Sequence, residues 1–228
     1  MKKLIFALVA IMCGVCSVNA GEVQEKICSD KSLSYCIKHF DRQCEAKNYL
    51  ACEIVGLLHF EQKQYSESKK YYELVCDKAN SKDSYQAESI DGNLGSKVPA
   101  IEFMGFTCGN LAKHYSNGWG VRQDEIKALQ YHKKACGLGN AHSCALAGGE
   151  YARGENVKND LKLAKSYLEK SCEMESGFGC LLLGAMYYDG AGVPKNLSKA
   201  KELYGKSCDL GEQSGCDKYK ELNEKGMK

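Results

Sequence analysis

The chain has 228 residues, of which 44% are apolar, so a hydrophobic core can form, and its two prolines suit a helical protein. The net charge is +2, and without Lys2 and Lys3 the chain has 29 basic and 29 acidic residues. This balance excludes an electrostatic footprint for nucleic acid or for a membrane surface.

Residues 1–20 have the pattern of a secretory signal peptide. Lys2 and Lys3 precede an apolar run over residues 4–16, and small residues end at Ala20. A membrane anchor is the alternative, but a run of about 13 residues is shorter than the roughly 20 that span a bilayer. We therefore predict cleavage after Ala20, with no membrane span in the mature chain.

Cleavage removes Cys13 and Cys16 and leaves twelve cysteines. Neither of the two follows a small residue, which disfavours a lipoprotein. An even number of regularly spaced cysteines in an exported chain predicts a disulfide framework. Zinc is the alternative, but the spacing does not suit it, the mature chain has no C-x-x-C, and the five histidines are scattered. We expect neither a metal nor a cofactor.

The first part of the mature chain is expected to form an N-terminal cap helix, within residues 21–48, and a short repeat over 49–80. A helix at 34–46 would bury Ile37, Phe40 and Cys44 on one face. Residues 81–101 are an insertion that starts polar and ends apolar. A surface loop of this length is either a tolerated insertion or a functional segment, and both interpretations stay open.

The rest of the chain follows a period of 36 residues, shown by Cys108, Cys144, Cys180 and Cys216 and by the interleaved Cys136, Cys172 and Cys208. Self-similarity at such a period predicts stacked helical repeats. The expected segments are repeat 2 at 102–138, repeat 3 at 139–174, repeat 4 at 175–210 and a C-terminal capping helix at 211–228.

Other residues repeat with the cysteines, and each has a physical reason. A small residue in the middle of the first helix lets the second helix approach closely; these are Ala112, Gly148 and Gly184. Glycine ends the first helix at Gly118, Gly154 and Gly190, and a second positive φ is expected at Gly120, Asn156 and Gly192. Good N-caps for the second helix are Asp124, Asp160 and Asn196.

Twelve cysteines allow many connectivities, and the repeat favours nearest neighbours. Residues eight apart in one helix have Cα atoms about 12 Å apart, beyond the reach of a disulfide. If Cys136 bonds Cys144, the chain must therefore reverse between them, where Gly139 can end a helix. The expected pairs are Cys28–Cys36, Cys44–Cys52, Cys76–Cys108, Cys136–Cys144, Cys172–Cys180 and Cys208–Cys216.

These residues carry a resemblance to a known family. The series Ala or Gly, Tyr three residues later, G-x-G-V, Asp, K-A and Y-x-K-(A/S)-C over 108–216 resembles the Sel1-like repeat, which is related to the tetratricopeptide repeat. A cysteine pair in each repeat is similar to the disulfide-bearing branch, the Helicobacter cysteine-rich protein family. The resemblance implies an all-α fold, a right-handed α/α superhelical solenoid of helix hairpins cross-linked by disulfides, with a concave groove.

Candidate catalytic residues are few. The S-x-x-K motif of serine β-lactamases occurs at Ser66/Lys69 and Ser198/Lys201, without its supporting motifs. His114 and His132 fall in one repeat and could meet across its hairpin, more plausibly as a structural pair than as an acid–base pair. We assign no catalytic residue.

The groove is the better candidate site, because its residues vary while the packing positions repeat. The expected groove residues are Asn110, His114, Asn117, Glu150, Arg153, Met186 and Asp189. A solvated face without function is the alternative. Trp119, the only tryptophan, is expected to be exposed in its loop, where it could anchor a partner or cover a packing gap.

The sequence thus predicts an exported Sel1-like scaffold, periplasmic or secreted, that binds a protein, peptide or peptidoglycan-related ligand in its groove. We expect a monomer with no nucleic-acid partner. The alternative is a weak β-lactamase or penicillin-binding hydrolase, an activity that the family resemblance implies and no motif of this chain supports.

Overall fold

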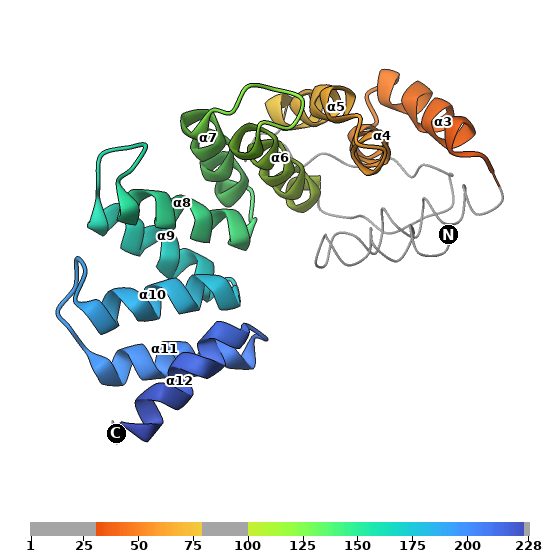
Figure 1. Cartoon of the computed structure of the whole chain (residues 1–228). Coiled ribbons are helices and arrows are strands. Elements are labelled where there is room, and N and C mark those ends of the chain that lie inside the picture. Colours follow the sequence, from red (N-terminus) through yellow and green to blue (C-terminus); the bar gives the residue numbers. More distant parts are fainter. Residues whose placement is uncertain (1–30, 79–99, 226–228) are drawn as a thin grey trace. The chain divides into compact units, whose positions relative to one another are not determined.

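A computed structural model describes residues 31–78 and 100–225 (Figure 1). The predicted signal peptide, its cleavage site and nearly all of the predicted insertion at 81–101 lie outside these residues. The described residues form ten α-helices and no strand: α3 Leu33–Glu45, α4 Tyr49–Glu61, α5 Tyr65–Lys78, α6 Ala100–Asn117, α7 Glu125–Gly137, α8 Ala141–Arg153, α9 Leu161–Glu173, α10 Gly177–Asp189, α11 Leu197–Asp209 and α12 Gln213–Glu224.

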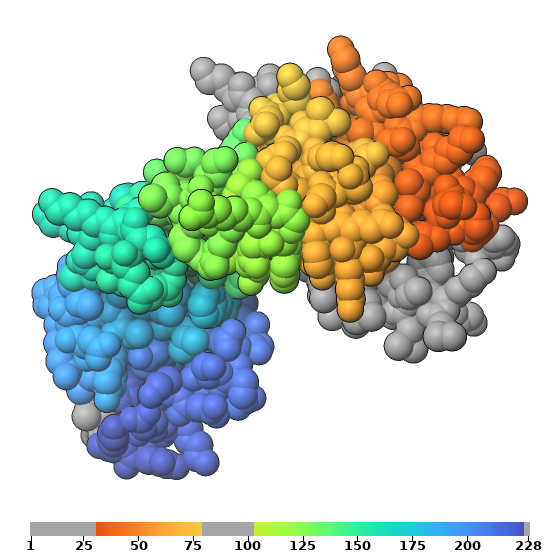
Figure 2. Space-filling view, turned by 45° about the horizontal axis from the view of Figure 1, so that its top comes forward, coloured from red at the N-terminus to blue at the C-terminus, as the bar shows by residue number. Residues whose placement is uncertain are grey.

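The chain divides into two compact units, Met1–Asp124 (unit 1) and Glu125–Lys228 (unit 2). In unit 1 each helix from α3 to α6 packs on the next, and α5 and α6 meet in the space-filling view (Figure 2). In unit 2 each helix from α7 to α12 packs on the next, and α10 also touches α8 and α12. The all-α fold of consecutive hairpins is as predicted.

Helix ends follow local side-chain chemistry. Polar side chains accept the N–H of the third residue after them at Ser32, Asn48, Asn140, Asp160, Ser176 and Asn196. Asp160 and Asn196 were predicted as N-caps. Gly154 and Gly190 end α8 and α10 with positive φ, as expected. The prediction for Asn156 is wrong: it does not have a positive φ, and its amide donates to Glu150.

Each hairpin is closed by a small residue in its first helix. A Cβ added to Gly148 would lie 2.8 Å from Leu168, and one added to Gly184 would lie 2.8 Å from Tyr204. Gly56 of the short repeat meets Tyr72 in the same way, at 2.6 Å. These approaches confirm that a larger residue would push the two helices apart.

Disulfides join the end of one hairpin to the start of the next. The structure contains Cys44–Cys52, Cys76–Cys108, Cys136–Cys144, Cys172–Cys180 and Cys208–Cys216, with Cα–Cα distances of 4.5 to 5.0 Å. Cys36 is also disulfide-bonded, and its expected partner Cys28 lies outside the described residues. In the four pairs that are eight residues apart, the chain reverses between the cysteines, which brings them within bonding distance.

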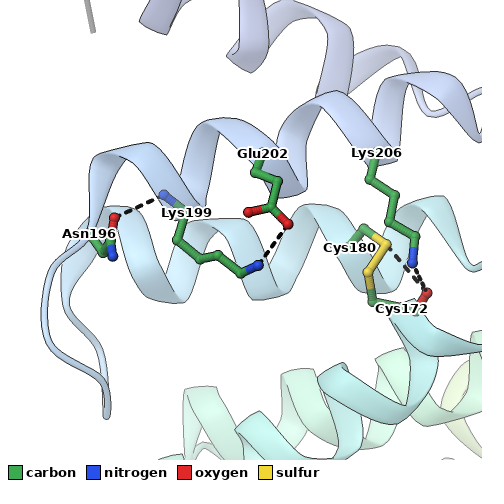
Figure 3. A network of polar contacts seen from close by, with 6 residues as sticks. All are labelled: Cys172, Cys180, Asn196, Lys199, Glu202 and Lys206. Carbon is green, nitrogen blue, oxygen red and sulfur yellow. Dashed lines mark hydrogen bonds and ion pairs between the residues drawn. A yellow bond between two sulfur atoms is a disulfide. The ribbon is translucent and has the colours of Figure 1, made fainter. Parts of the chain in front are cut away.

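The same junctions hold a repeated set of polar contacts that the sequence did not reveal. Lys206 donates to the carbonyl of Cys172 at 3.0 Å, beside the Cys172–Cys180 disulfide (Figure 3), and Lys170 donates to that of Cys136 at 3.1 Å. These ammonium groups cap carbonyls at helix C-termini, where the helix dipole favours a cation. The last turn of each hairpin therefore stabilises the end of the hairpin before it.

A serine next to each of these lysines completes the junction. Ser171 donates to the carbonyl of Ala141 at 2.7 Å, and Ser207 donates to that of Gly177 at 2.8 Å. The space for the two hydroxyl groups comes from Gly179 and Gly215, where an added Cβ would overlap the serine Oγ. Each of these two junctions therefore pairs a serine with a glycine, which has no side chain.

Candidate functional site

The predicted groove residues occupy three repeat positions, and the prediction of an exposed side chain is wrong at one of them. His114, Glu150 and Met186 lie 36 residues apart, so they share that position. His114 is 0% exposed, Met186 is 5% exposed, and the Glu150 side chain is 16% exposed. Met186 packs in the unit 2 core with Ala145 and Leu183. A first helix packs on the second helix of its own hairpin and also on a neighbouring hairpin. The repeat position of His114, Glu150 and Met186 faces the neighbouring hairpin.

Other first-helix positions remain open to solvent. Asn117, Arg153 and Asp189, again 36 apart, are exposed, and Asn110 is half-buried. In unit 2 the open stripe contains Arg153 and Asp189, which were predicted as groove residues, and other residues that were not predicted. We call this stripe, together with the buried Gly149 of α8, the first-helix face: Leu146 and Arg153 of α8, and Leu182, Ala185 and Asp189 of α10. Gly148 and Gly184 point at the second helices. The positions on the opposite side of each first helix follow from the helical period, and they would have predicted the first-helix face.

The first-helix face is apolar with charged ends. Leu146, Leu182 and Ala185 are each partly exposed, and α8 packs directly on α10. Gly149 keeps the surface low, because an added Cβ would touch Leu182 at 3.8 Å and the Arg153 guanidinium at 3.6 Å. Arg153 is ion-paired with Glu150, which fixes the guanidinium beside the apolar residues. The face can therefore accept an apolar group next to a charged or polar one.

Trp119 is not the exposed loop residue that the sequence suggested. Its side chain is half-buried, stacks on Tyr65 at 5.6 Å between ring centroids, and meets the edge of Phe60 at 5.2 Å. Both partners come from the short hairpin of α4 and α5. Of the two roles left open for Trp119, the structure favours covering a packing gap.

His114 lies beneath Trp119 and bonds within unit 1. Its Nδ1 donates to the Trp119 carbonyl at 2.8 Å, and its Nε2 lies 3.4 Å from the Ser68 hydroxyl. A hydroxyl beside an imidazole resembles a nucleophile and its base, but Ser68 and His114 are both 0% exposed and cannot meet a substrate. His132 bonds Ser143 in unit 2, so each histidine has its own structural partner.

Comparison with known proteins gives a consistent family. Three segments match the Sel1 repeat: residues 107–140, 141–176 and 178–212. Helicobacter pylori cysteine-rich protein B is 34% identical over 52% of this chain and 90% of its own length, with a TM-score of 0.42. The chain belongs to the Sel1 repeat family. The 34% identity confirms the expected resemblance to the disulfide-bearing branch.

Two further solved structures resemble these Sel1 repeats. A Sel1 repeat protein from Oxalobacter formigenes is 27% identical over 54% of this chain and 93% of its own, with a TM-score of 0.47. The protein c5321, a protective antigen of uropathogenic Escherichia coli, is 23% identical over 86% of this chain and 46% of its own, with a TM-score of 0.51. The second supports the fold alone. No curated protein matches the chain.

The lysines of the two S-x-x-K motifs contact other side chains. Lys69 is ion-paired with Glu73 at 3.1 Å. Lys201 lies 5.7 Å over the ring of Tyr219. Among the described residues there is no cluster of metal-ligating side chains and no helix long and apolar enough to cross a membrane.

Glu53 of α4 is a buried carboxyl group that sequence reasoning missed. It is 3% exposed and bonds the Thr107 hydroxyl of α6. The Thr107 hydroxyl also donates to the Phe103 carbonyl at 3.1 Å, and its bond to the carboxyl lowers the pKa of Glu53, against the larger effect of burial. Burial raises the pKa of Glu53 to about 8, from 4.5. The residues next to Glu53 in the sequence are apolar, and this pattern does not indicate a buried carboxyl group.

Replacing Glu53 by Gln is expected to stabilise unit 1 in a pH-dependent way. Because the folded pKa is raised, the protonated carboxyl contributes its full stability below pH 4.5 and loses it as pH rises towards 8. Gln can donate to Thr107 at every pH. We expect Glu53→Gln to raise Tm by several degrees at pH 8 and hardly at all at pH 4.5, measured by helical circular dichroism. Glu67→Gln, on the exposed side of α5, is the control. An equal gain at both pH values would contradict a protonated Glu53.

Proposed function

We propose that the chain is an exported Sel1 repeat scaffold that binds a protein, peptide or cell-wall ligand on its first-helix face. The family is one of interaction scaffolds, and the observation that carries the proposal is the chemistry of this face in unit 2. Leu146, Leu182 and Ala185 are partly exposed, Gly149 lies beside Leu182, and Arg153 and Asp189 end the two helices. The leucine position repeats, while Gly149 and Ala185, and Arg153 and Asp189, differ between the two repeats.

Export is supported by the cysteines and by the N-terminal sequence. Cross-links between consecutive hairpins persist in an oxidising compartment and are rare where thiols are kept reduced. The pattern of residues 1–20 agrees with this. The periplasm and the external medium both meet the requirement, and we propose one of them as the working compartment.

The face suits an extended or helical peptide better than a small rigid ligand. An apolar side chain can lie on Ala185 and the two leucines, and a neighbouring carboxylate can reach the guanidinium of Arg153, whose side chain is 52% exposed. Asp189 offers the opposite charge one repeat further on. A peptide with one apolar anchor and charges of both signs matches this order.

The experiment is capture with a blocked face. Ala185→Arg places a long cation in the middle of the first-helix face, and we expect it to abolish capture of ligand from periplasm or medium by the purified chain. Ser166→Arg, on the exposed side of α9, adds the same charge elsewhere and should leave capture intact. Defined muropeptides, tested with the same two variants, separate a cell-wall ligand from a protein. Equal capture by both variants would exclude the face as the binding site.

A further inference from the structure

The Trp119 loop, residues 118–120, is docked on α4 and α5 within unit 1. The Trp119 N–H donates to the His114 carbonyl at 2.9 Å, and the His114 ring returns a bond to the Trp119 carbonyl. Gly120 lies directly on the start of α5, where an added Cβ would be 2.5 Å from the Tyr65 carbonyl carbon. The loop is therefore held by one histidine, two aromatic contacts and a close backbone approach.

The imidazole of His114 is buried on every side. Four aromatic rings meet it edge-on, with centroid distances of 5.5 to 6.2 Å: Phe60, Tyr65, Tyr72 and Trp119. Nδ1 carries the hydrogen donated to the Trp119 carbonyl, so in the neutral ring Nε2 accepts from Ser68. A second proton must bind Nε2, which already accepts a hydrogen bond from the Ser68 hydroxyl. The resulting imidazolium has no contact with water.

The charges around His114 do not compensate for its burial. Of the elements packed against it, α4 contributes Phe60, and α5 contributes Tyr65 and Tyr72 together with Lys69 and Glu73. Lys69 disfavours the imidazolium and Glu73 favours it, and the two are ion-paired at 3.1 Å. Burial is the largest effect and lowers the pKa of His114 from 6.5, although the bond to the Trp119 carbonyl acts in the opposite direction.

We propose that the Trp119 loop is an acid-released cover, which leaves α4 and α5 when His114 is protonated and thereby exposes Phe60 and Tyr65. Lifting Trp119 is the shortest route by which water can reach the imidazolium, because the loop is the only non-helical segment among its described contacts. The helices stay folded, because the protonated Glu53 supports the α4–α6 contact most strongly at low pH. The result is an aromatic surface that is covered at neutral pH and open in acid.

The single tryptophan makes the release measurable without a label. We expect acrylamide quenching of Trp119 to rise several-fold as pH falls, with a one-proton midpoint below 6.5 and no loss of helical circular dichroism. Asn at position 114 keeps a donor near the place of Nδ1 but does not titrate. In His114→Asn the quenching should be the same at all pH values down to global unfolding. A retained transition in this variant, or no transition in the parent chain, would overturn the proposal.

Three further variants, one of them a control, keep the test independent of whether His114→Asn folds. Lys69→Met removes the cation that opposes the imidazolium and should move the midpoint to higher pH, which a merely structural histidine would not do. Gly120→Ala should open the loop at neutral pH, because its Cβ cannot fit against α5. Gly192→Ala makes the matching change in unit 2, 2.5 Å from Leu161, and should leave Trp119 covered. An unmoved midpoint in Lys69→Met, or equal quenching in the two glycine variants, would refute the cover.

Discussion

Replacing Cys76 and Cys108 together by alanine is expected to lower the free energy of unfolding of unit 1 by about 4 kcal/mol, against about 2.5 kcal/mol for Cys172 and Cys180 in unit 2. The difference follows from loop length, because the first bond joins residues separated by 32 positions and the second by 8. A longer loop loses more conformational entropy in the unfolded chain when it is closed.

This comparison is matched, because the four sulfur atoms are equally shielded. Cys76, Cys108 and Cys180 are 0% exposed and Cys172 is 4% exposed, so the cavities left by alanine are similar. Denaturant unfolding followed by Trp119 fluorescence reports unit 1, and helical circular dichroism reports the whole chain. Equal losses for the two double variants would show that local packing, and not loop closure, sets the value of these cross-links.

The second large effect is expected at the serine–glycine junctions. Gly179→Ala should cost about 2 to 3 kcal/mol, because the new methyl group overlaps the Ser171 hydroxyl in a closely packed site. Ser171→Ala alone loses one hydrogen bond to the Ala141 carbonyl and should cost about 1 kcal/mol. The double variant removes the hydroxyl that the methyl group strikes, so we expect it to be more stable than Gly179→Ala alone.

Such non-additivity is the signature of direct contact. The chain already contains a related arrangement at the previous junction, where Ala135 and Ser143 occupy the corresponding positions and both are buried. There the small residue and the serine have exchanged places, and the Ser143 hydroxyl bonds His132. The next junction, Ser207 with Gly215, offers an independent repeat of the cycle. Additive losses at both junctions would show that the structure relaxes around the added methyl group.

The sequence predicted the hairpins well because each hairpin rests on residues with a restricted role. Gly148 and Gly184 permit close approach, Asp160 and Asn196 cap helices, and the period of 36 sets them in register. These constraints act within one repeat, so three copies are enough to reveal them. The helix ends follow from the same residues.

The exposed face was harder to predict, because a first helix of a solenoid is buried on more than one side. Its apolar residues point at the partner helix and at the neighbouring hairpins, so the open stripe is narrow and an error of one residue moves a prediction into the core. That is what happened at Met186, one residue from Ala185, and at His114, one residue from Lys113. Glu53 and the position of Trp119 depend on contacts between repeats, which no pattern within a repeat contains.

The junction lysines and serines limit how such a chain can change length. Lys170 and Lys206 each reach a carbonyl 34 positions earlier, and Ser171 and Ser207 each reach one 30 positions earlier. Every bond is thus shorter than one period, and a block of 36 residues carries one complete set. Duplication or loss of a whole block preserves all of them, while an insertion inside a helix between the partners shifts every pair that spans it. The contacts between repeats therefore favour growth of the array by whole blocks of 36 residues.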